Sequence, residues 1–268
     1  MPLLCVCSPK GGVGKTTLAA NLAHGFRRGG RRVVALDLDP QNALRLHFGL
    51  PHDQALGFIA ELPRHPDWRG ALHETPSGVA LLPYGATDAG ARLALGQALD
   101  VDPELLAAPV RDMLADPNLV VVVDTPPGAS RSLSILLPMA DLILVPLMAD
   151  GGSTATLPEV ESGRFLGRGT LGAMLGARMR FVLNGVDQGS RLSAAVASAL
   201  LRHLGPRLLG LVARDEAVAE ALACEALLTD HAPHALAAYD LAEVLRAVDG
   251  ILFPAAARAI GMPAGASA

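Results

Sequence analysis

Short apolar runs alternate with longer amphipathic segments along this chain. Runs such as LVVVV (119–123) and LILVPL (142–147) are typical of strands that are buried on both faces of a sheet. Strands alternating with helices need right-handed crossovers, so the pattern predicts an α/β fold with a mostly parallel central sheet of roughly seven or eight strands and helices on both faces. The predicted strands cover 3–7, 32–37, 79–83, 119–123, 142–147, 178–184 and 207–211. The predicted helices cover 16–28, 88–98, 103–115, 130–139, 153–166, 192–203, 216–223 and 234–249.

The size and composition of the chain indicate one large domain. With 268 residues, 51% of them hydrophobic, the chain can bury a sizeable core. We expect a single domain over residues 1–253 and a disordered, alanine- and proline-rich tail over 254–268. Residues 51–77 contain proline, histidine and the single Trp68 with weak periodicity, which predicts a surface excursion between the second and third strands.

The same features indicate a cytoplasmic protein without a membrane-spanning helix. The apolar runs are shorter than the roughly 20 residues needed to cross a bilayer, and the start MPLLCVC lacks the charged and long apolar regions of a secretory signal. A net charge of −4 does not favour general attraction to nucleic acid or anionic lipid. Cys5 and Cys7 alternate along a predicted strand and are expected to be buried thiols.

The stretch SPKGGVGKTT, residues 8–17, contains both lysines of the chain. It follows a predicted strand and precedes a helix, which is the context of a P-loop. Gly11, Gly12 and Gly14 allow a sharp turn that directs several backbone N–H groups at one anion. The positive end of the helix favours the same anion. The stretch therefore predicts a phosphate-binding turn.

Three side chains of this turn have the chemistry to bind a nucleotide with its metal. In a P-loop, Lys15 reaches the β- and γ-phosphates, and the Thr16 hydroxyl binds Mg²⁺. Thr17 places a second hydroxyl at the start of the helix. The motif therefore predicts a P-loop NTPase with ATP or ADP and Mg²⁺ as its cofactors.

Aspartates come at the ends of two predicted buried strands. Asp37 and Asp39 are two positions apart and lie on the same face of an extended segment, and LVVVVD delivers Asp124. The carboxyl ends of parallel strands meet at the edge where the phosphate-binding turn lies. We therefore expect Asp39 and Asp124 near the γ-phosphate and Mg²⁺, with Asp37 in a supporting position.

The phosphate-binding turn departs from the general P-loop pattern. Pro9 stands where that pattern has glycine, and Lys10 adds a second cation. The variant KGGVGKTT resembles the deviant Walker A motif of the MinD/ParA ATPases. The resemblance implies an ATP-dependent homodimer in which Lys10 reaches the partner's nucleotide. It also implies that Asp39 is the switch I residue that positions the attacking water and helps to bind the metal, and that Asp124 belongs to the Walker B and switch II element.

Later loops resemble the base-binding part of this family. Asn184 ends the strand in FVLNGVD, and Arg214 and Asp215 precede a helix in LVARDEAVAEA. From the residues alone, Asn184 could equally be a turn residue and Asp215 a helix N-cap. The resemblance implies contacts with adenine. The candidate catalytic residues are Lys10, Lys15 and Asp39, and the candidate metal ligands are Thr16, Asp39 and Asp124. The candidate nucleotide-binding residues are Lys10, Gly11, Gly12, Val13, Gly14, Lys15, Thr16, Thr17, Asn184, Arg214 and Asp215.

Three weaker motifs resemble the BcsQ (YhjQ) branch of these ATPases. They are QNALRLHFG (41–49), LLPYG (81–85) and RDEAVAEAL (214–222). ParA proteins usually have D-x-D-P-Q-G-N at switch I, whereas Asn42 here directly follows Gln41. The resemblance implies a role in assembly, localisation or secretion by bacterial cellulose synthase. The implied partners are a small BcsR-like protein and the synthase complex, which would bring the protein to the inner membrane.

Two other classes remain as alternatives. A ParA or MinD relative would position chromosomes, plasmids or division proteins, but five Arg against eight Asp or Glu from residue 200 onward do not favour DNA binding. The alanine-rich last turns also lack the basic amphipathic helix by which MinD binds membranes. A metabolic P-loop ligase would need a substrate pocket that the sequence does not locate. Because no side chain is an obvious strong base, we expect slow ATP hydrolysis.

Overall fold

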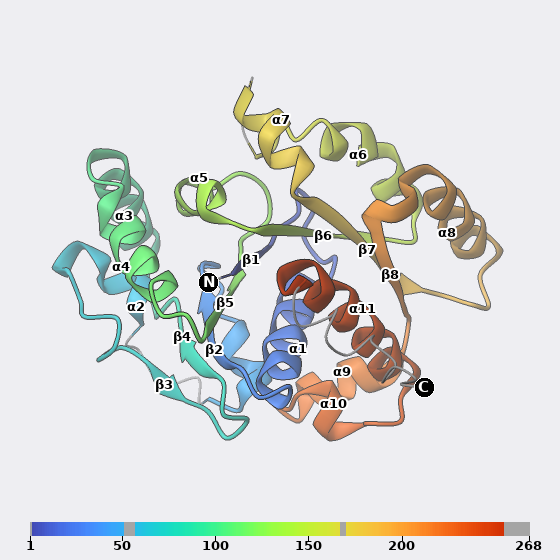
Figure 1. The fold of residues 1–268 in the computed structure, drawn as a ribbon, viewed down its shortest axis with the longest axis horizontal. Helices are drawn as coiled ribbons and strands as arrows, with labels where there is room; N and C mark the ends of the chain where they lie inside the picture. Colours follow the sequence, from blue (N-terminus) through green and yellow to red (C-terminus); the bar gives the residue numbers. More distant parts are fainter. Residues whose placement is uncertain (1, 51–56, 167–169, 255–268) are drawn as a thin grey trace, which may run out of the picture.

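Strand β1 lies near the centre of an eight-stranded sheet, and the glycine turn follows it directly (Figure 1). The computed structural model describes residues 2–50, 57–166 and 170–254. The strand order is β3-β4-β2-β5-β1-β6-β7-β8, and all described neighbours are parallel except β3 and β4. The strands are β1 (Leu3–Val6), β2 (Arg32–Asp37), β3 (His73–Glu74), β4 (Ala80–Leu82), β5 (Leu119–Asp124), β6 (Leu142–Met148), β7 (Met179–Val186) and β8 (Leu208–Ala213). The predicted α/β class and parallel sheet are confirmed.

Helices cover both faces of this sheet (Figure 1). The α-helices are α1 (Lys15–Arg28), α2 (Phe58–Glu61), α3 (Ala89–Val101), α4 (Glu104–Leu114), α5 (Arg131–Leu136), α6 (Gly151–Glu161), α7 (Thr170–Ala177), α8 (Arg191–Leu204), α9 (Glu216–Ala223), α10 (Leu228–His231) and α11 (Leu236–Leu252). Short 3-10 helices are η1 (Leu44–Phe48), η2 (Leu62–Arg64), η3 (Leu137–Met139) and η4 (Gly205–Arg207). The predicted strands all formed, whereas β3, α2, α7 and α10 were not predicted. Residues 255–268 of the expected tail lie outside the described residues.

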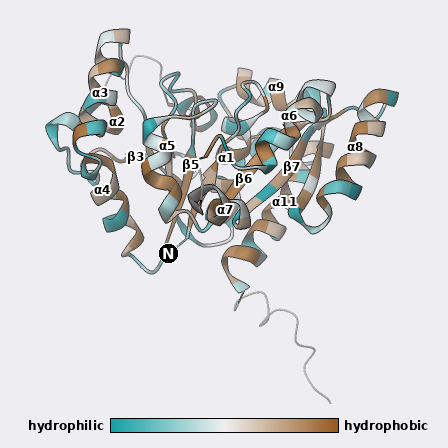
Figure 2. Ribbon diagram, turned by 90° about the horizontal axis from the view of Figure 1, so that it is seen from above, coloured by the Kyte–Doolittle hydropathy of each residue, from teal (hydrophilic) through white to brown (hydrophobic). Residues whose placement is uncertain are grey.

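Each face of the sheet has its own hydrophobic core, and alternate strand residues enter different cores. In β1 and the residue after it, Leu3, Cys5 and Cys7 face the core beneath α2–α8, whereas Leu4 and Val6 face the core beneath α1 and α9–α11. Figure 2 shows hydrophobic colouring along the central strands between these layers. Burial on both faces explains why the strands are continuous apolar runs. The thiols expected to be buried are buried, and burial raises the pKa of Cys7 to about 12.

Several helices begin with an N-cap residue whose side chain accepts a hydrogen bond from a free backbone N–H group of the first turn. Asp88, Ser130, Asp150, Ser190 and Asp215 each accept a hydrogen bond from an amide in the first turn of α3, α5, α6, α8 or α9. Such N-caps are worth about 1 kcal/mol each. Two of these N-caps also concern the predicted nucleotide site, because Asp150 pairs with Lys10 and Asp215 is a candidate nucleotide-binding residue.

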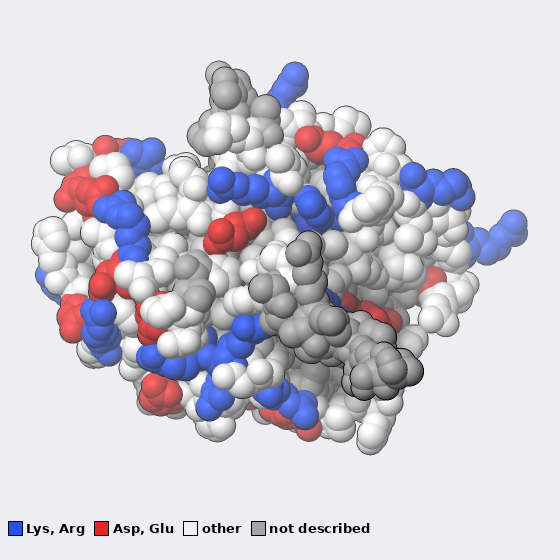
Figure 3. All heavy atoms as spheres, in the orientation of Figure 1, with Lys and Arg blue, Asp and Glu red and all other residues white. Residues whose placement is uncertain are grey.

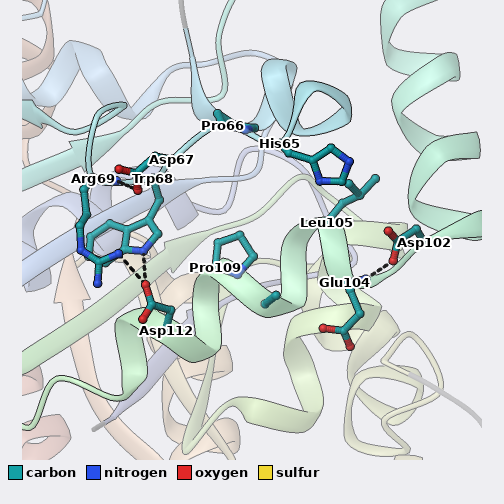
Figure 4. Close-up of a pocket in the computed structure, with 11 residues that line it drawn as sticks. His65, Pro66, Asp67, Trp68, Arg69, Asp102, Glu104, Leu105, Pro109 and Asp112 are labelled. Carbon is teal, nitrogen blue, oxygen red and sulfur yellow. Dashed lines mark hydrogen bonds and ion pairs between the residues drawn. The ribbon is translucent and has the colours of Figure 1, made fainter.

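The expected excursion after β2 contains α2, η2 and β3, and it is attached to α4 (Figure 4). The Nε1 of Trp68 donates to Oδ2 of Asp112 over 2.8 Å, and Arg69 donates to the same oxygen over 2.6 Å. The Arg69 guanidinium also lies 4.4 Å from the centre of the Trp68 ring. A cavity of about 410 Å³ beside this cluster shares none of its lining residues with the cleft at the glycine turn.

Candidate nucleotide-binding site

The glycine turn joins the carboxyl end of β1 to the start of α1, and its shape depends on two glycines. Gly12 has φ +72° and Gly14 has φ +89°, which are left-handed conformations that residues with a Cβ rarely adopt. A Cβ on Gly14 would also lie 2.2 Å from Nδ2 of Asn184. That amide donates to the carbonyl of Val13 over 3.0 Å. The left-handed backbone of Gly14 and the close approach of the Asn184 side chain therefore both favour glycine at position 14.

A cleft of about 350 Å³ brings the turn together with the loop after β2. The Lys15 side chain lines it and is buried, with 6% of the residue exposed. Thr16 and Asp39 line the same cleft, which confirms that segments 23 residues apart meet at this edge of the sheet. The full lining is Gly11, Gly12, Gly14, Lys15, Thr16, Thr17, Asp39, Gln41, Ala43, Leu46, His47, Pro127 and Leu222.

Asp124 ends β5 at the same edge and is completely buried. Burial raises its pKa to about 7, and the charge of Asp39 acts in the same direction, whereas the hydroxyl of Thr16, the ammonium of Lys15 and the Thr125 amide lower it. The Thr125 amide donates to Oδ1, while Oδ2 has no hydrogen-bond partner within the described part of the chain. A buried, unpartnered carboxylate oxygen beside the turn suits a cation or its hydration shell.

Asp37 is the neighbour of Asp124 in the sheet, but the loop that follows covers its carboxylate. The two residues are paired in the parallel register of β2 and β5, and Asp37 is fully buried. Burial raises the pKa of Asp37, and the charge of Asp124 raises it further. The amides of Asp39 and Leu44 donate to its two oxygens. Asp37 and Asp39 were expected on one face, yet only Asp39 lines the cleft.

Lys10 lies at the outer side of the turn and does not line this cleft. Its Nζ donates to Oδ2 of Asp150 over 2.8 Å, and its side chain is 37% exposed. Asp150 also caps α6 through its other oxygen and has a lowered pKa, chiefly because of the hydrogen bond from Lys10. The two lysines of one short motif therefore occupy different environments.

The three residues proposed to contact adenine have different surroundings: one supports the glycine turn, one is exposed and one caps a helix. Asn184 is part of the turn's support through Val13, as described above. Arg214 is exposed and its NH1 lies 4.0 Å from Oδ2 of Asp187. Asp215 accepts from the amides of Ala217 and Ala237, so it caps α9 and holds the start of α11. The N-cap interpretation of Asp215 is confirmed, and contact of these three residues with a base stays a prediction.

Sequence reasoning missed two residues that the fold brings to this region. Asp150 follows the buried strand β6 and precedes Gly-Gly-Ser, so the capping pattern D-x-x-S was a usable signal for its position but not for its contact with Lys10. His47 is buried in the cleft wall, and burial lowers its pKa to about 4. Nothing local in the sequence distinguishes His47 from an exposed histidine.

The described residues contain no group of three or more His, Cys, Asp or Glu that could bind a metal by themselves. A left-handed glycine turn, a buried lysine and carboxylates at the ends of neighbouring parallel strands define the molecule as a P-loop NTPase.

Comparison with known proteins places the chain within this class. It matches the family model of the cellulose biosynthesis protein BcsQ over residues 1–247. The chromosome-partitioning ATPase Soj of Thermus thermophilus is 31% identical over 86% of this chain and 88% of Soj. BcsQ of Salmonella typhimurium is 26% identical over 90% of this chain and 91% of that protein. The chain belongs to the BcsQ family.

Solved structures share the fold. The septum site-determining protein MinD of Pyrococcus horikoshii, solved with Mg-ADP, superposes with a TM-score of 0.72 at 20% identity over 94% of this chain and 98% of MinD. Cobyrinic acid a,c-diamide synthase of Mycobacterium smegmatis, solved with an ATP analogue and magnesium, has a TM-score of 0.63 at 23% identity, covering 80% and 85% of the two chains. The predicted MinD/ParA fold and the predicted BcsQ relationship are thus confirmed.

The raised pKa of Asp124 predicts a specific pH dependence of stability. The folded protein holds a proton on Asp124 up to about pH 7, whereas the unfolded chain releases it near 3.8, so the free energy of unfolding should fall as pH rises through this window. In metal-free protein at about pH 8, Asp124→Asn should raise it by about 2–4 kcal/mol. Urea unfolding of both proteins measures this. A gain of the same size at about pH 3, where Asp124 is protonated in the folded protein and mostly protonated in the unfolded chain, would contradict the assignment.

The contact between Asn184 and the turn predicts unequal effects of alanine at two glycines. Gly12 and Gly14 both have positive φ, but a Cβ on Gly12 meets nothing within 4 Å. Gly12→Ala should lower the free energy of unfolding by about 1–2 kcal/mol through backbone strain alone. Gly14→Ala should cost about 1–3 kcal/mol more, because it also displaces the Asn184 amide. Equal losses in urea unfolding would show that the approach of Asn184 is unimportant.

Proposed function

We propose that the protein is an ATP-dependent dimerisation switch that supports the assembly, localisation or secretion of bacterial cellulose synthase. The separation of its two lysines carries the proposal. Lys15 is buried in the cleft, whereas Lys10 leaves it and pairs with Asp150 on the partly exposed surface. The Lys10 ammonium is held outside its own cleft by one partly exposed ion pair, which is worth at most about 1 kcal/mol. A stronger anion could therefore replace Asp150 as its partner. The γ-phosphate of a partner's ATP is such an anion.

The cleft residues would bind ATP or ADP with Mg²⁺. Amides of residues 10–17 and the ammonium of Lys15 would bind the phosphates. The Thr16 hydroxyl, with the carboxylates of Asp39 and Asp124, would hold the metal and its water. The Mg²⁺ ion supplies positive charge that neutralises the phosphate oxygens. Asn184, Arg214 and Asp215 would lie at the base, Arg214 being the most exposed of them.

Hydrolysis would be slow and would rest on positioning. Asp39 is the carboxylate of the cleft that could orient a water molecule toward the γ-phosphate, and Lys10 of the partner would stabilise the charge that develops. His47 is neutral above about pH 4 because burial lowers its pKa to about 4, and it stands in the cleft wall as a buried packing residue. Closing the dimer would exclude bulk water from this chemistry.

The family relationship supports the cellular role. BcsQ proteins are described as cellulose biosynthesis proteins, so we propose that the ATP-bound dimer docks on cellulose-secretion subunits such as a small BcsR-like protein and the synthase complex. Within the described residues, no helix has the length and apolar character to cross a membrane. We propose a cytoplasmic protein that reaches the inner membrane through these partners.

A second candidate function is the positioning of chromosomes or plasmids. Its support is the 31% identity to the partitioning ATPase Soj, which exceeds the identity to the BcsQ of Salmonella typhimurium. On the face shown in Figure 3, however, basic side chains are interspersed with acidic ones. Two arginines that follow α1 are paired with acidic side chains, Arg31 with Asp249 and Arg32 with Asp116. These pairings reduce the free positive charge available to DNA phosphates next to α1, which weighs against DNA binding.

The two lysines provide matched variants that separate nucleotide binding from dimerisation. Lys15→Ala should weaken ATP binding by about a hundredfold or more, since it removes a buried ammonium that faces the phosphates. Lys10→Ala should bind ATP within about threefold of wild type but remain monomeric, because the nucleotide of each protomer loses only the partner's lysine. Calorimetry measures the affinity, and light scattering with ATP or ADP measures the mass. If Lys10→Ala still forms an ATP-bound dimer at the protein concentration at which wild type dimerises, Lys10 does not act across the dimer interface.

Asp39→Ala should accumulate as an ATP-bound dimer. The variant keeps the phosphate-binding turn but lacks the carboxylate that orients water, so we expect its turnover to fall by about tenfold or more while its mass with ATP doubles. Phosphate release and light scattering measure the two effects. A monomer in the presence of ATP would contradict the switch.

The same stable dimer distinguishes the two cellular roles. The ATP-bound dimer of Asp39→Ala is mixed with duplex DNA at low and at moderate salt. If the protein acts in cellulose synthesis, we expect no salt-sensitive DNA binding. Tight, salt-sensitive binding by the dimer but not by the ADP-bound monomer would favour the partitioning function instead.

A further inference from the structure

The loop that carries Asp39 is closed around the carboxylate of Asp37. Asp37 is the last residue of β2, and its Oδ1 accepts from the amide of Asp39 over 2.9 Å. Its Oδ2 accepts from the amide of Leu44 over 3.2 Å. One buried side chain thus binds the loop shortly after it leaves the sheet and again where η1 begins. We call residues 38–44 the switch I loop.

Apolar anchors and a second polar anchor hold the same loop. Leu38 is buried in the core beneath α2–α8, and Leu44 is buried in the core on the opposite face. Between them, Asn42 is buried with φ +52°, and its Oδ1 accepts from the amide of Tyr84 over 3.1 Å. The loop therefore has little freedom to move its middle residues relative to the sheet.

Asp39, Gln41 and Ala43 of this loop line the cleft, and Asp39 supplies the carboxylate among them. Its Oδ1 accepts from the amide of Gln41, and its carbonyl accepts from the amide of Asn42. These are contacts within the loop, so they set the side chain relative to the loop but not relative to the glycine turn. The orientation relative to the turn comes from the anchors of the loop, and Asp37 is the anchor whose side chain accepts from the amide of Asp39 itself.

We propose that Asp37 is a positioning residue: by accepting hydrogen bonds from the amides of Asp39 and Leu44, it holds the Asp39 carboxylate in the cleft. This inference rests on the proposed function for the role of Asp39. Asp37 does not line the cleft, and both of its oxygens are engaged by amides. Asp124 differs, because its Oδ2 is left without a partner among the described residues. Neither aspartate lines the cleft, and the two differ in that Asp37 uses both oxygens on the loop whereas Asp124 keeps one oxygen without a partner among the described residues.

The variant Asp37→Asn tests this role. Asparagine keeps the shape but has one acceptor oxygen, and its NH₂ cannot accept from an amide, so at least one anchor is lost. In the nucleotide-free protein, hydrogen exchange at the amides of Asp39 or Leu44 should become roughly tenfold faster or more. Exchange in β5 should not change. Asp141→Asn is the matched control, because it removes a carboxylate that accepts from the amide of Leu3 far from the cleft.

Steady-state kinetics distinguish positioning from metal binding. In Asp37→Asn, kcat for ATP hydrolysis should fall about tenfold to a hundredfold, since small displacements of a catalytic group have effects of this size. The KM for ATP and the Mg²⁺ concentration for half-maximal activity should stay within about twofold of wild type. Asp141→Asn should keep the wild-type values.

Three results would overturn the inference. Unchanged exchange at both amides would show that Asp37 does not hold the loop. Faster exchange with unchanged kcat would show that the anchor does not affect the reaction. A large rise in the Mg²⁺ requirement would make Asp37 a metal-binding residue instead.

If Asp37→Asn does not fold, rapid exchange of both amides in the wild-type protein also contradicts the anchor. Absence of ATP hydrolysis by wild type would refute the proposed function, and exchange alone would then decide the role of Asp37.

Discussion

Two buried carboxylates at the ends of neighbouring parallel strands set the conditions for the rest of this site. Asp37 and Asp124 are paired in register, and both are fully buried. Like charges in a desolvated position are costly unless donors or cations compensate for them. The chain supplies backbone amides to Asp37 from the loop that follows it, and it supplies Thr125, Thr16 and Lys15 to Asp124. The loop closed around Asp37 and the unpartnered oxygen of Asp124 are both part of this arrangement.

The contact between Asn42 and Tyr84 connects motifs that look independent in the sequence. QNALRLHFG and LLPYG each indicated the BcsQ family, and the amide of Tyr84 donates to Oδ1 of Asn42. Asparagine tolerates the left-handed backbone that glycine adopts in loops, so Asn42 provides both the conformation and the acceptor. The third motif lies on α9, and its Leu222 lines the cleft together with His47 of η1. The three family motifs therefore meet around the switch I loop.

The two lysines show how one short motif can serve two sites. Lys15 enters the cleft because α1 begins there, whereas Lys10 stands before the left-handed glycines and leaves on the outer side. Asp150 holds Lys10 and also caps α6, so any movement of Lys10 toward a partner frees a carboxylate at the start of that helix. In the proposed switch, dimerisation is thereby linked to the region of α6.

The sequence by itself determined the class of fold, the phosphate-binding turn and the aspartates at the strand ends. These features depend on local patterns: apolar runs, glycine spacing and the rule that carboxyl ends of parallel strands share one edge. Only the tertiary structure decided that Asp37 holds a loop while Asp124 keeps a free oxygen, that Lys10 pairs with Asp150, and that Asn184 supports the turn. Each of these contacts, other than that of Asp37, joins residues more than one hundred positions apart. Which partner such a residue meets depends on strand order and packing, because the residue types alone permit several partners.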